Sequence, residues 1–159
     1  MINNEFYTFG EYMKKEDSNI TASMEDYIEM IWRLSMNTGF TRMSELSEAL
    51  NVHPPSATRM VQRLGKLGLL KYEKYGVIIL KDNGIKLGKF LLKRHNIIEA
   101  FLRIFSIPED RILTETEKIE HTLSSETTKC FEDYVSYIKA NPDIINKFNE
   151  WRSNNASSR

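Results

Sequence analysis

The segment PPSATRMVQRLGKLG, residues 54–68, decides the fold of the N-terminal part of this chain. Two prolines begin it, and the first turn of a helix tolerates proline because its N–H groups have no partner within the helix. Apolar residues then recur at helical spacing, at Ala57, Met60, Val61, Leu64 and Leu67. The segment therefore predicts an amphipathic helix that ends near Gly68.

The opposite face of this helix is polar and basic, with Ser56, Arg59, Gln62, Arg63 and Lys66. Arginine matches the O6 and N7 atoms of guanine, glutamine matches N6 and N7 of adenine, and serine or lysine reaches phosphate. This face predicts a recognition helix for the major groove of DNA. The alternative is an ordinary solvated helix face.

The neighbouring segments favour the DNA-binding interpretation. We expect a first helix from about Ser23, its N-cap, a second helix from about residue 42, and a hairpin over residues 69–81 around Gly76. This order is that of a winged helix-turn-helix. Thr41 would form an anion site at the start of the second helix, and Lys74 and Tyr75 at the hairpin tip would contact the DNA backbone or minor groove.

The charge distribution supports a polyanion partner for the middle of the chain. The chain holds 22 basic and 22 acidic residues, but residues 41–103 hold 12 bases and 5 acids, a balance of +7, between acidic ends. The composition is that of an ordinary globular protein, and neither a membrane span nor a signal peptide is recognisable. Because Cys130 is the only cysteine, we expect a cytoplasmic protein.

The C-terminal half predicts helices throughout. A long helix from Asn83 to about Phe105 ends before Pro108, and shorter helices are expected at 109–114, 115–125 and 126–139, with a further one after Pro142. Four regions follow from this pattern. They are an N-terminal extension (1–20), a winged helix-turn-helix domain (21–82), a linker helix with a helical domain (83–145) and a C-terminal tail (146–159). The last part of this tail, RSNNASSR (152–159), is polar and is expected to be disordered.

Candidate metal ligands occur on three of these helices. The stretch TETEKIEHTLS, residues 114–124, contains Glu117, Glu120 and His121 on one helical face. The first helix contains Asp26 and Glu29 three residues apart, and the long helix contains His95. Carboxylates with imidazole suit Mn²⁺ or Fe²⁺. The alternative is that Glu117 and Asp26 only cap their helices, because Thr114 and Ser23 precede them at capping-box spacing.

Five motifs in order, SMEDYIE, VHPPSATRMVQRL, YEKY, KRHNIIEAFL and EKIEHTLS, resemble the diphtheria toxin repressor family, and within it the manganese-responsive branch. The resemblance runs from about Ser23 to Tyr137. It implies a mainly α protein, in which a winged helix-turn-helix domain is joined by a long helix to an all-helical metal-binding and dimerisation domain. The chain ends too early for the SH3-like third domain of some relatives.

The resemblance also implies a function and a ligand set. The protein would be a homodimeric, manganese-activated repressor of metal uptake genes that binds operator DNA, with no membrane, no small organic substrate and no enzymatic activity. Two Mn²⁺ ions per chain would share Glu117 and Glu120. One ion would be completed by Asp26, Glu29 and His95, and the other by His121. The dimer surface would include Ile98, Phe101, Leu102 and Phe105.

Three alternatives remain open from the residues themselves. An iron-responsive repressor of the same family would use Fe²⁺ at the same positions. A metal-independent winged-helix repressor would leave the acidic residues as surface. A metal-dependent hydrolase would use the carboxylates to activate water, but it would leave the helix-turn-helix without a purpose.

Overall fold

The structure, a computed structural model, describes residues 20–156. These residues fall into two compact units that divide between Leu92 and Lys93, within the long helix α5 (Asp82–Ile104). Almost all of the expected N-terminal extension lies outside the described residues. Among the described residues, no helix is both long and apolar enough to cross a membrane.

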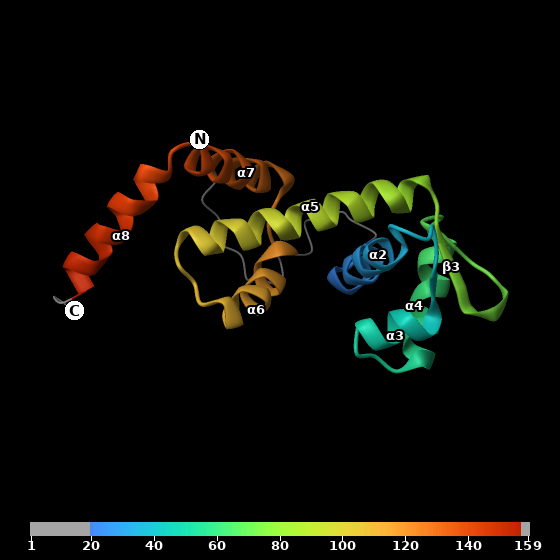
Figure 1. The fold of residues 1–159 in the computed structure, drawn as a ribbon. Coiled ribbons are helices and arrows are strands. Elements are labelled where there is room, and N and C mark those ends of the chain that lie inside the picture. Colours follow the sequence, from blue (N-terminus) through green and yellow to red (C-terminus); the bar gives the residue numbers. More distant parts are fainter. Residues whose placement is uncertain (1–19, 157–159) are drawn as a thin grey trace, which may run out of the picture. The chain divides into compact units, whose positions relative to one another are not determined.

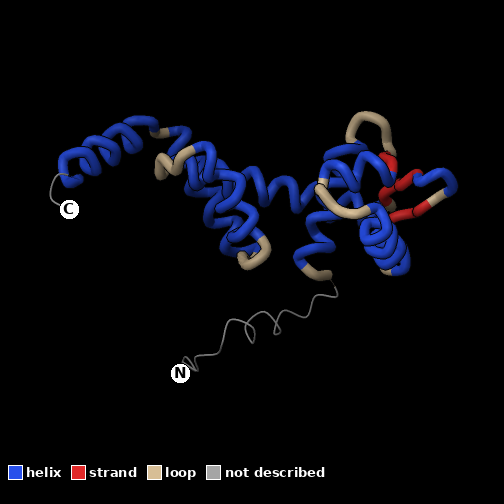
Figure 2. Tube along the Cα trace, turned by 90° about the horizontal axis from the view of Figure 1, so that it is seen from below, coloured by secondary structure: helices blue, strands red, loops and turns tan. Residues whose placement is uncertain are grey.

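The first unit contains three helices and a small sheet, α2 (Ala22–Ser35), β1 (Thr41–Arg42), α3 (Met43–Ala49), α4 (Pro54–Lys66), β2 (Leu70–Tyr72), the 3-10 turn η1 (Lys74–Gly76) and β3 (Val77–Leu80). The strands are antiparallel in the order β1-β3-β2, and they gather at one place beside the helices (Figure 2). This arrangement is a winged helix-turn-helix, as the order of elements predicted. The β1 strand was not predicted, because two residues are too few to show a period.

The core of the first unit is formed by most of the apolar positions that the sequence predicted; Leu67, expected on the buried face of α4, is instead exposed at the end of the helix. Ile28 from α2, Leu46 from α3, Leu64 from α4 and Ile78 from β3 are completely buried. Gly68 follows α4 with φ +76°, a left-handed conformation that ends the helix as predicted. The recognition helix is therefore held by its apolar face, and its polar face is left at the surface.

The second unit consists of the C-terminal half of α5 with α6 (Glu109–Glu120), α7 (Ser125–Ala140) and α8 (Pro142–Ala156). Figure 1 shows α6 and α7 on two sides of this part of α5. Phe101 of α5 stacks on Phe131 of α7, with ring centroids 4.1 Å apart, and Phe105 packs edge-on against Phe148 of α8. Ile98 is completely buried. Ile98 thus packs within the chain itself, which corrects its assignment to a dimer surface, whereas Phe101 is only half-buried and its place on that surface stays a prediction.

Several predicted helix boundaries were wrong. The first helix has Thr21, not Ser23, at its N-cap. The helices expected at 109–114 and 115–125 are one helix, α6, because Thr114 lies in its interior rather than at a cap. The segment 152–156, which was expected to be disordered, is helical, because α8 continues to Ala156. Local capping signals occur inside helices as well as at their ends, so they do not fix a boundary alone.

Candidate metal centre

His95 is the central side chain of the candidate metal centre in the second unit. It lies on α5 and is only 3% exposed. Its Nδ1 atom is 3.4 Å from Oε1 of Glu120 and 3.6 Å from Oε1 of Glu117, while its Nε2 atom is 3.3 Å from Oε1 of Glu99. Both edges of the imidazole ring therefore face carboxylates.

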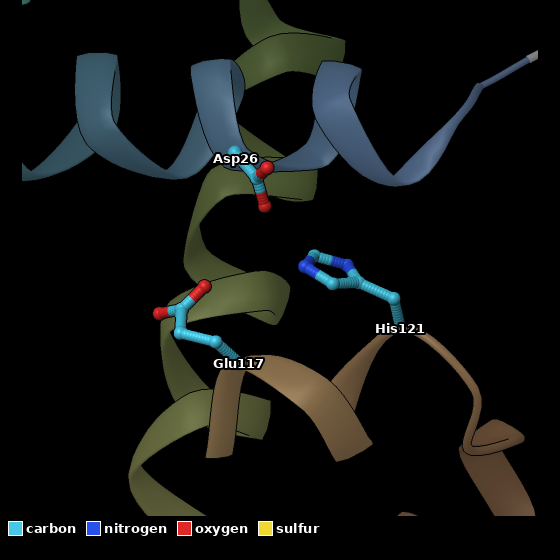
Figure 3. Close-up of side chains that lie close together, drawn as sticks. All are labelled: Asp26, Glu117 and His121. Carbon is cyan, nitrogen blue, oxygen red and sulfur yellow. The ribbon is translucent and has the colours of Figure 1, made fainter. Parts of the chain in front are cut away.

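The last turn of α6 supplies the other ligands of this unit. Glu117 and His121 project from the same side of α6 (Figure 3), and a ligand atom of each lies within 4.8 Å of the other. His95 and Glu120 form a second pair, whose ligand atoms also lie within 4.8 Å of each other. Because α6 begins at Glu109, with Pro108 at its N-cap, Glu117 does not cap a helix. The capping-box interpretation of Glu117 is wrong.

Glu120 shows that this cluster fits a cation. Its side chain is 1% exposed, and its Oε2 atom has no hydrogen-bond partner among the described residues. A buried carboxylate is costly unless an opposite charge compensates it. Carboxylate oxygens beside imidazole nitrogens are the donor set that Mn²⁺ and Fe²⁺ accept. The residues present therefore fit the divalent ion that the sequence predicted.

Two predicted ligands, Asp26 and Glu29, belong to α2 in the first unit. They are three residues apart and so lie on one face of the helix, from which Asp26 projects in Figure 3. Glu29 is buried and accepts a hydrogen bond of 2.9 Å from Nε of Arg33. The N-cap of α2 is Thr21, so the capping box expected from Ser23 to Asp26 is not formed.

Sequence reasoning missed two residues that contact the predicted ligands. Nη2 of Arg94 is 3.2 Å from Nδ1 of His121. Glu99, which faces His95, also accepts a hydrogen bond of 3.0 Å from Nη1 of Arg103. Hydrogen bonds to Glu109 and then to Glu99 raise the pKa of Arg103 above its usual range. The i,i+4 spacing of His95 and Glu99 was a usable signal, whereas nothing in the sequence links Arg94 to His121.

The predicted DNA-binding residues of α4 all lie at the surface. Their side chains are exposed along one face of the helix, and they are Ser56, Arg59, Gln62, Arg63 and Lys66. Lys74 and Tyr75 lie in η1, at the tip of the wing. Tyr75 is 91% exposed and has φ 62°, so its ring is presented to solvent.

Thr41 differs from the other predicted DNA-binding residues. It lies in β1 and is completely buried, and its hydroxyl donates to Oε2 of Glu45 over 2.9 Å. The backbone N–H of Arg42 donates to the same oxygen over 2.9 Å. The hydrogen bond from the Arg42 backbone, and to a lesser extent that from the Thr41 hydroxyl, lowers the pKa of Glu45. The Thr41 side chain thus connects β1 to α3.

Comparison with known proteins identifies the family. Residues 19–78 match the iron dependent repressor N-terminal DNA binding domain, and residues 81–149 match the iron dependent repressor metal binding and dimerisation domain. The chain is 47% identical over 127 residues to the HTH-type transcriptional regulator MntR of Lysinibacillus sphaericus (strain C3-41), covering 80% of this chain and 91% of that protein. It is 46% identical over 119 residues to MntR of Bacillus subtilis (strain 168), covering 75% and 84%.

A solved structure, that of the manganese regulator SloR, has the same fold. It superimposes with a TM-score of 0.64 at 28% sequence identity, covering 72% of this chain and 54% of the SloR chain. The chain described here thus spans about half the length of that protein. Both domains and their order agree with the winged helix-turn-helix and helical units described above. The chain belongs to the iron-dependent, or diphtheria toxin, repressor family, and it is a metal-dependent, dimeric, DNA-binding transcriptional repressor rather than an enzyme.

Proposed function

We propose that this protein is a manganese-activated repressor of metal uptake genes. The observation that carries the proposal is the buried carboxylate of Glu120 beside His95, in the same chain as the exposed Arg and Gln face of α4. The first feature would be stabilised by a bound cation, and the second suits the major groove of operator DNA. Because its partner is DNA, we propose that the protein acts in the cytoplasm.

The ligands are Asp26, Glu29, His95, Glu117, Glu120 and His121. Two pairs in the second unit, Glu117 with His121 and His95 with Glu120, each offer one carboxylate and one imidazole. Two protein ligands are too few to hold Mn²⁺, which prefers a larger set of oxygen donors. We propose that the α2 carboxylates, Asp26 and Glu29, would complete the ligand set, and that Glu117 and Glu120 would contribute to holding both ions.

Ligands from both units would couple metal binding to DNA binding. Asp26 and Glu29 belong to the unit that holds α4, whereas the other four ligands belong to the second unit. Without a cation, the carboxylates repel one another; a bound divalent ion supplies the compensating positive charge. The carboxylates of α2 then hold the DNA-binding unit in one orientation. In the homodimer this orientation sets the two recognition helices at the spacing of successive major grooves, roughly 34 Å.

Manganese is favoured by the donor set and by the relatives. No cysteine or methionine is among the six ligands, and hard oxygen donors suit Mn²⁺. Two relatives carry the name MntR, and the SloR structure is described as that of a manganese regulator. Iron is the second candidate, because the matching family is named for iron dependence and Fe²⁺ accepts the same donors.

The first experiment titrates metal-free protein with Mn²⁺ and follows the free ion by electron paramagnetic resonance. We expect about two ions per chain, and DNA binding that appears with them. Glu117→Ala should abolish the metal-dependent DNA binding while circular dichroism shows an intact fold. Glu115→Ala is the matched control, because Glu115 lies on the same helix and pairs with Lys118 at the surface.

The duplex for this experiment is selected from a random-sequence pool in the presence of Mn²⁺. Binding that is insensitive to a chelator would contradict the proposal. Repeating the titration at buffered free concentrations of Fe²⁺ separates the two candidate metals. Activation by Fe²⁺ at a lower free concentration than by Mn²⁺ would favour the iron-responsive alternative.

A further inference from the structure

The second unit has a small apolar core. Of the buried apolar side chains in the described part of the chain, fourteen lie in the first unit. The second unit contributes only four, which are Ile98, Ile112, Val135 and Ile138. A unit of fewer than about 70 residues rarely folds around so small a core without further stabilisation, and oligomerisation is a usual source of it. The second unit therefore needs a partner that covers more of its apolar surface.

Three helices of this unit share a row of aromatic side chains, which we call the aromatic face. Each helix contributes two residues, spaced three or four apart, and this spacing places both on one side of the helix. The rings in contact along the row have centroids between 4.1 and 6.3 Å apart. The members are Phe101 and Phe105 of α5, Phe131 and Tyr134 of α7, and Phe148 and Trp151 of α8.

The described residues do not cover the aromatic face. Tyr134 is 40% exposed and Trp151 is 59% exposed, while the four phenylalanines are only half-buried. Within residues 142–155 of α8, no side chain is completely buried. A soluble monomer rarely leaves an apolar patch of this kind in contact with water, and such patches mark interaction sites. The aromatic face is therefore a surface for a partner.

Arg152 holds the end of α8 against the end of α5. Its Nη1 atom donates a hydrogen bond of 2.6 Å to the carbonyl oxygen of Phe105, the residue that follows α5, and its guanidinium lies 5.7 Å from the ring centroid of Phe148. The last carbonyls of a helix have no partner within the helix, so this contact satisfies one of them. It also fixes the adjacent Trp151 before any partner binds, which lowers the entropy cost of binding.

We propose that the aromatic face is covered by the same face of a second copy of this chain, with Trp151 as an anchor of the dimer interface. A twofold dimer brings identical patches together, and aromatic residues are enriched at the centres of such interfaces. Five of the six residues lie within the match to the dimerisation domain, residues 81–149, and Trp151 extends the face beyond it.

The charges of α8 favour a second copy over a polyanion. The helix carries two acidic and two basic residues, which are Asp143, Glu150, Lys147 and Arg152. A helix without net charge does not attract DNA or an acidic membrane surface, but it can face its own copy without repulsion. The inference goes beyond the proposed function, because it holds whichever metal the protein binds.

The first test follows the fluorescence of Trp151. The chain has two tryptophans, and the other, Trp32, lies in the first unit, so Trp32→Phe leaves Trp151 as the only one. Metal-free protein is diluted while sedimentation velocity reports the dimer. As the dimer dissociates, we expect the emission of Trp151 to shift to longer wavelength and its quenching by iodide to increase. Emission and quenching that stay constant through dissociation would overturn the inference. If the dimer persists at every dilution, efficient quenching in the intact dimer would overturn it.

The second test compares two substitutions in metal-free protein. Trp151→Ala should raise the dissociation constant of the dimer at least about tenfold, as expected for a buried aromatic anchor. Leu113→Ala is the control, because Leu113 is 58% exposed on α6, which contributes nothing to the aromatic face, and we expect no change. Circular dichroism checks that both variants fold.

Two outcomes would overturn the role of Trp151. One is an equal dissociation constant in wild type and Trp151→Ala. The other is a loss of DNA binding in Trp151→Ala while the dimer is unchanged, which would assign the aromatic face to DNA. Neither outcome depends on Mn²⁺ binding, so the failure of this inference can be told from the failure of the proposed function.

Discussion

Nδ1 of His95 lies 3.4 Å from Oε1 of Glu120, and both side chains are buried. The two residues come from α5 and α6 and are 25 positions apart. Two ionisable groups meet here away from water, with one carboxylate oxygen left without a hydrogen bond among the described residues. Such an arrangement lowers the stability of the fold in the absence of a cation, and binding of a cation raises it.

Glu120→Gln tests this relationship. In metal-free protein we expect the variant to be at least as stable as the wild type, because a buried charge is removed. At a Mn²⁺ concentration of 100 times Kd the wild type should gain about 2.7 kcal/mol, whereas the variant should gain less than about 1 kcal/mol. Thermal unfolding with and without Mn²⁺ measures both. An equal gain in the two proteins would remove Glu120 from the site.

Arg63→Ala tests the exposed face of α4. Loss of a bidentate contact to guanine should weaken the free energy of binding to the selected duplex by about 1–3 kcal/mol. The free energy of binding to unrelated DNA should change much less. Mn²⁺ affinity should not change, because Arg63 is exposed on α4 and is not one of the six proposed ligands. Fluorescence anisotropy at several salt concentrations measures the effect.

Lys66→Ala provides the comparison on the same face. If Lys66 contacts phosphate, its removal should weaken binding to all duplexes alike and reduce the salt slope by about 1. Equal losses on selected and unrelated DNA in Arg63→Ala would instead assign Arg63 to the phosphate backbone.

Gly88→Ala tests the packing of α5 within the first unit. A Cβ atom at Gly88 would lie 2.6 Å from Cβ of Trp32, so α5 must shift to admit it. Alanine is the better helix former by about 1 kcal/mol, but overpacking of this kind costs about 1–3 kcal/mol. We expect a net loss of stability in chemical denaturation.

Gly65→Ala is the control for that substitution. Gly65 also lies in a helix, but its added Cβ would meet Leu70 at 3.7 Å, an ordinary contact. Gly65→Ala should therefore stabilise the protein by up to about 1 kcal/mol. Stabilisation by both substitutions would show that α5 moves freely against α2.

Glu45→Gln tests the connection between β1 and α3. The pKa of Glu45 is lower in the folded protein than its usual value, because the N–H of Arg42 and the hydroxyl of Thr41 donate hydrogen bonds to the carboxylate. A lowered pKa stabilises the fold above the unfolded pKa, and this contribution is lost as the pH falls through the folded pKa. The stability difference between wild type and variant should therefore be largest near neutral pH.

Urea unfolding between about pH 3 and pH 7, a range that spans the carboxyl titration, measures this difference. Glu48→Gln, on the exposed face of the same helix, controls for the loss of one negative charge. A difference between wild type and Glu45→Gln that stays constant over this range would contradict the role of the ionised carboxylate.

The helices and the chemical types of the ligands were predictable from the sequence. The apolar period of residues 54–68 and the prolines at its start define α4, because helix periodicity and capping are local properties. The same locality explains why Ser56, Arg59 and Arg63 were assigned to one exposed face. Glu117, Glu120 and His121 were likewise placed on one face by their spacing alone.

Only the tertiary structure decided which of these groups meet. It brought His95 to Glu120 and placed Arg94 beside His121. It also buried Thr41 in β1, a strand of two residues that is too short to be predicted from the sequence. It also continued α6 through Thr114, where the sequence suggested a cap. Spacing along a helix determines the face that a side chain occupies. The partner on the other side of that face depends on the packing of distant segments, which no local pattern encodes.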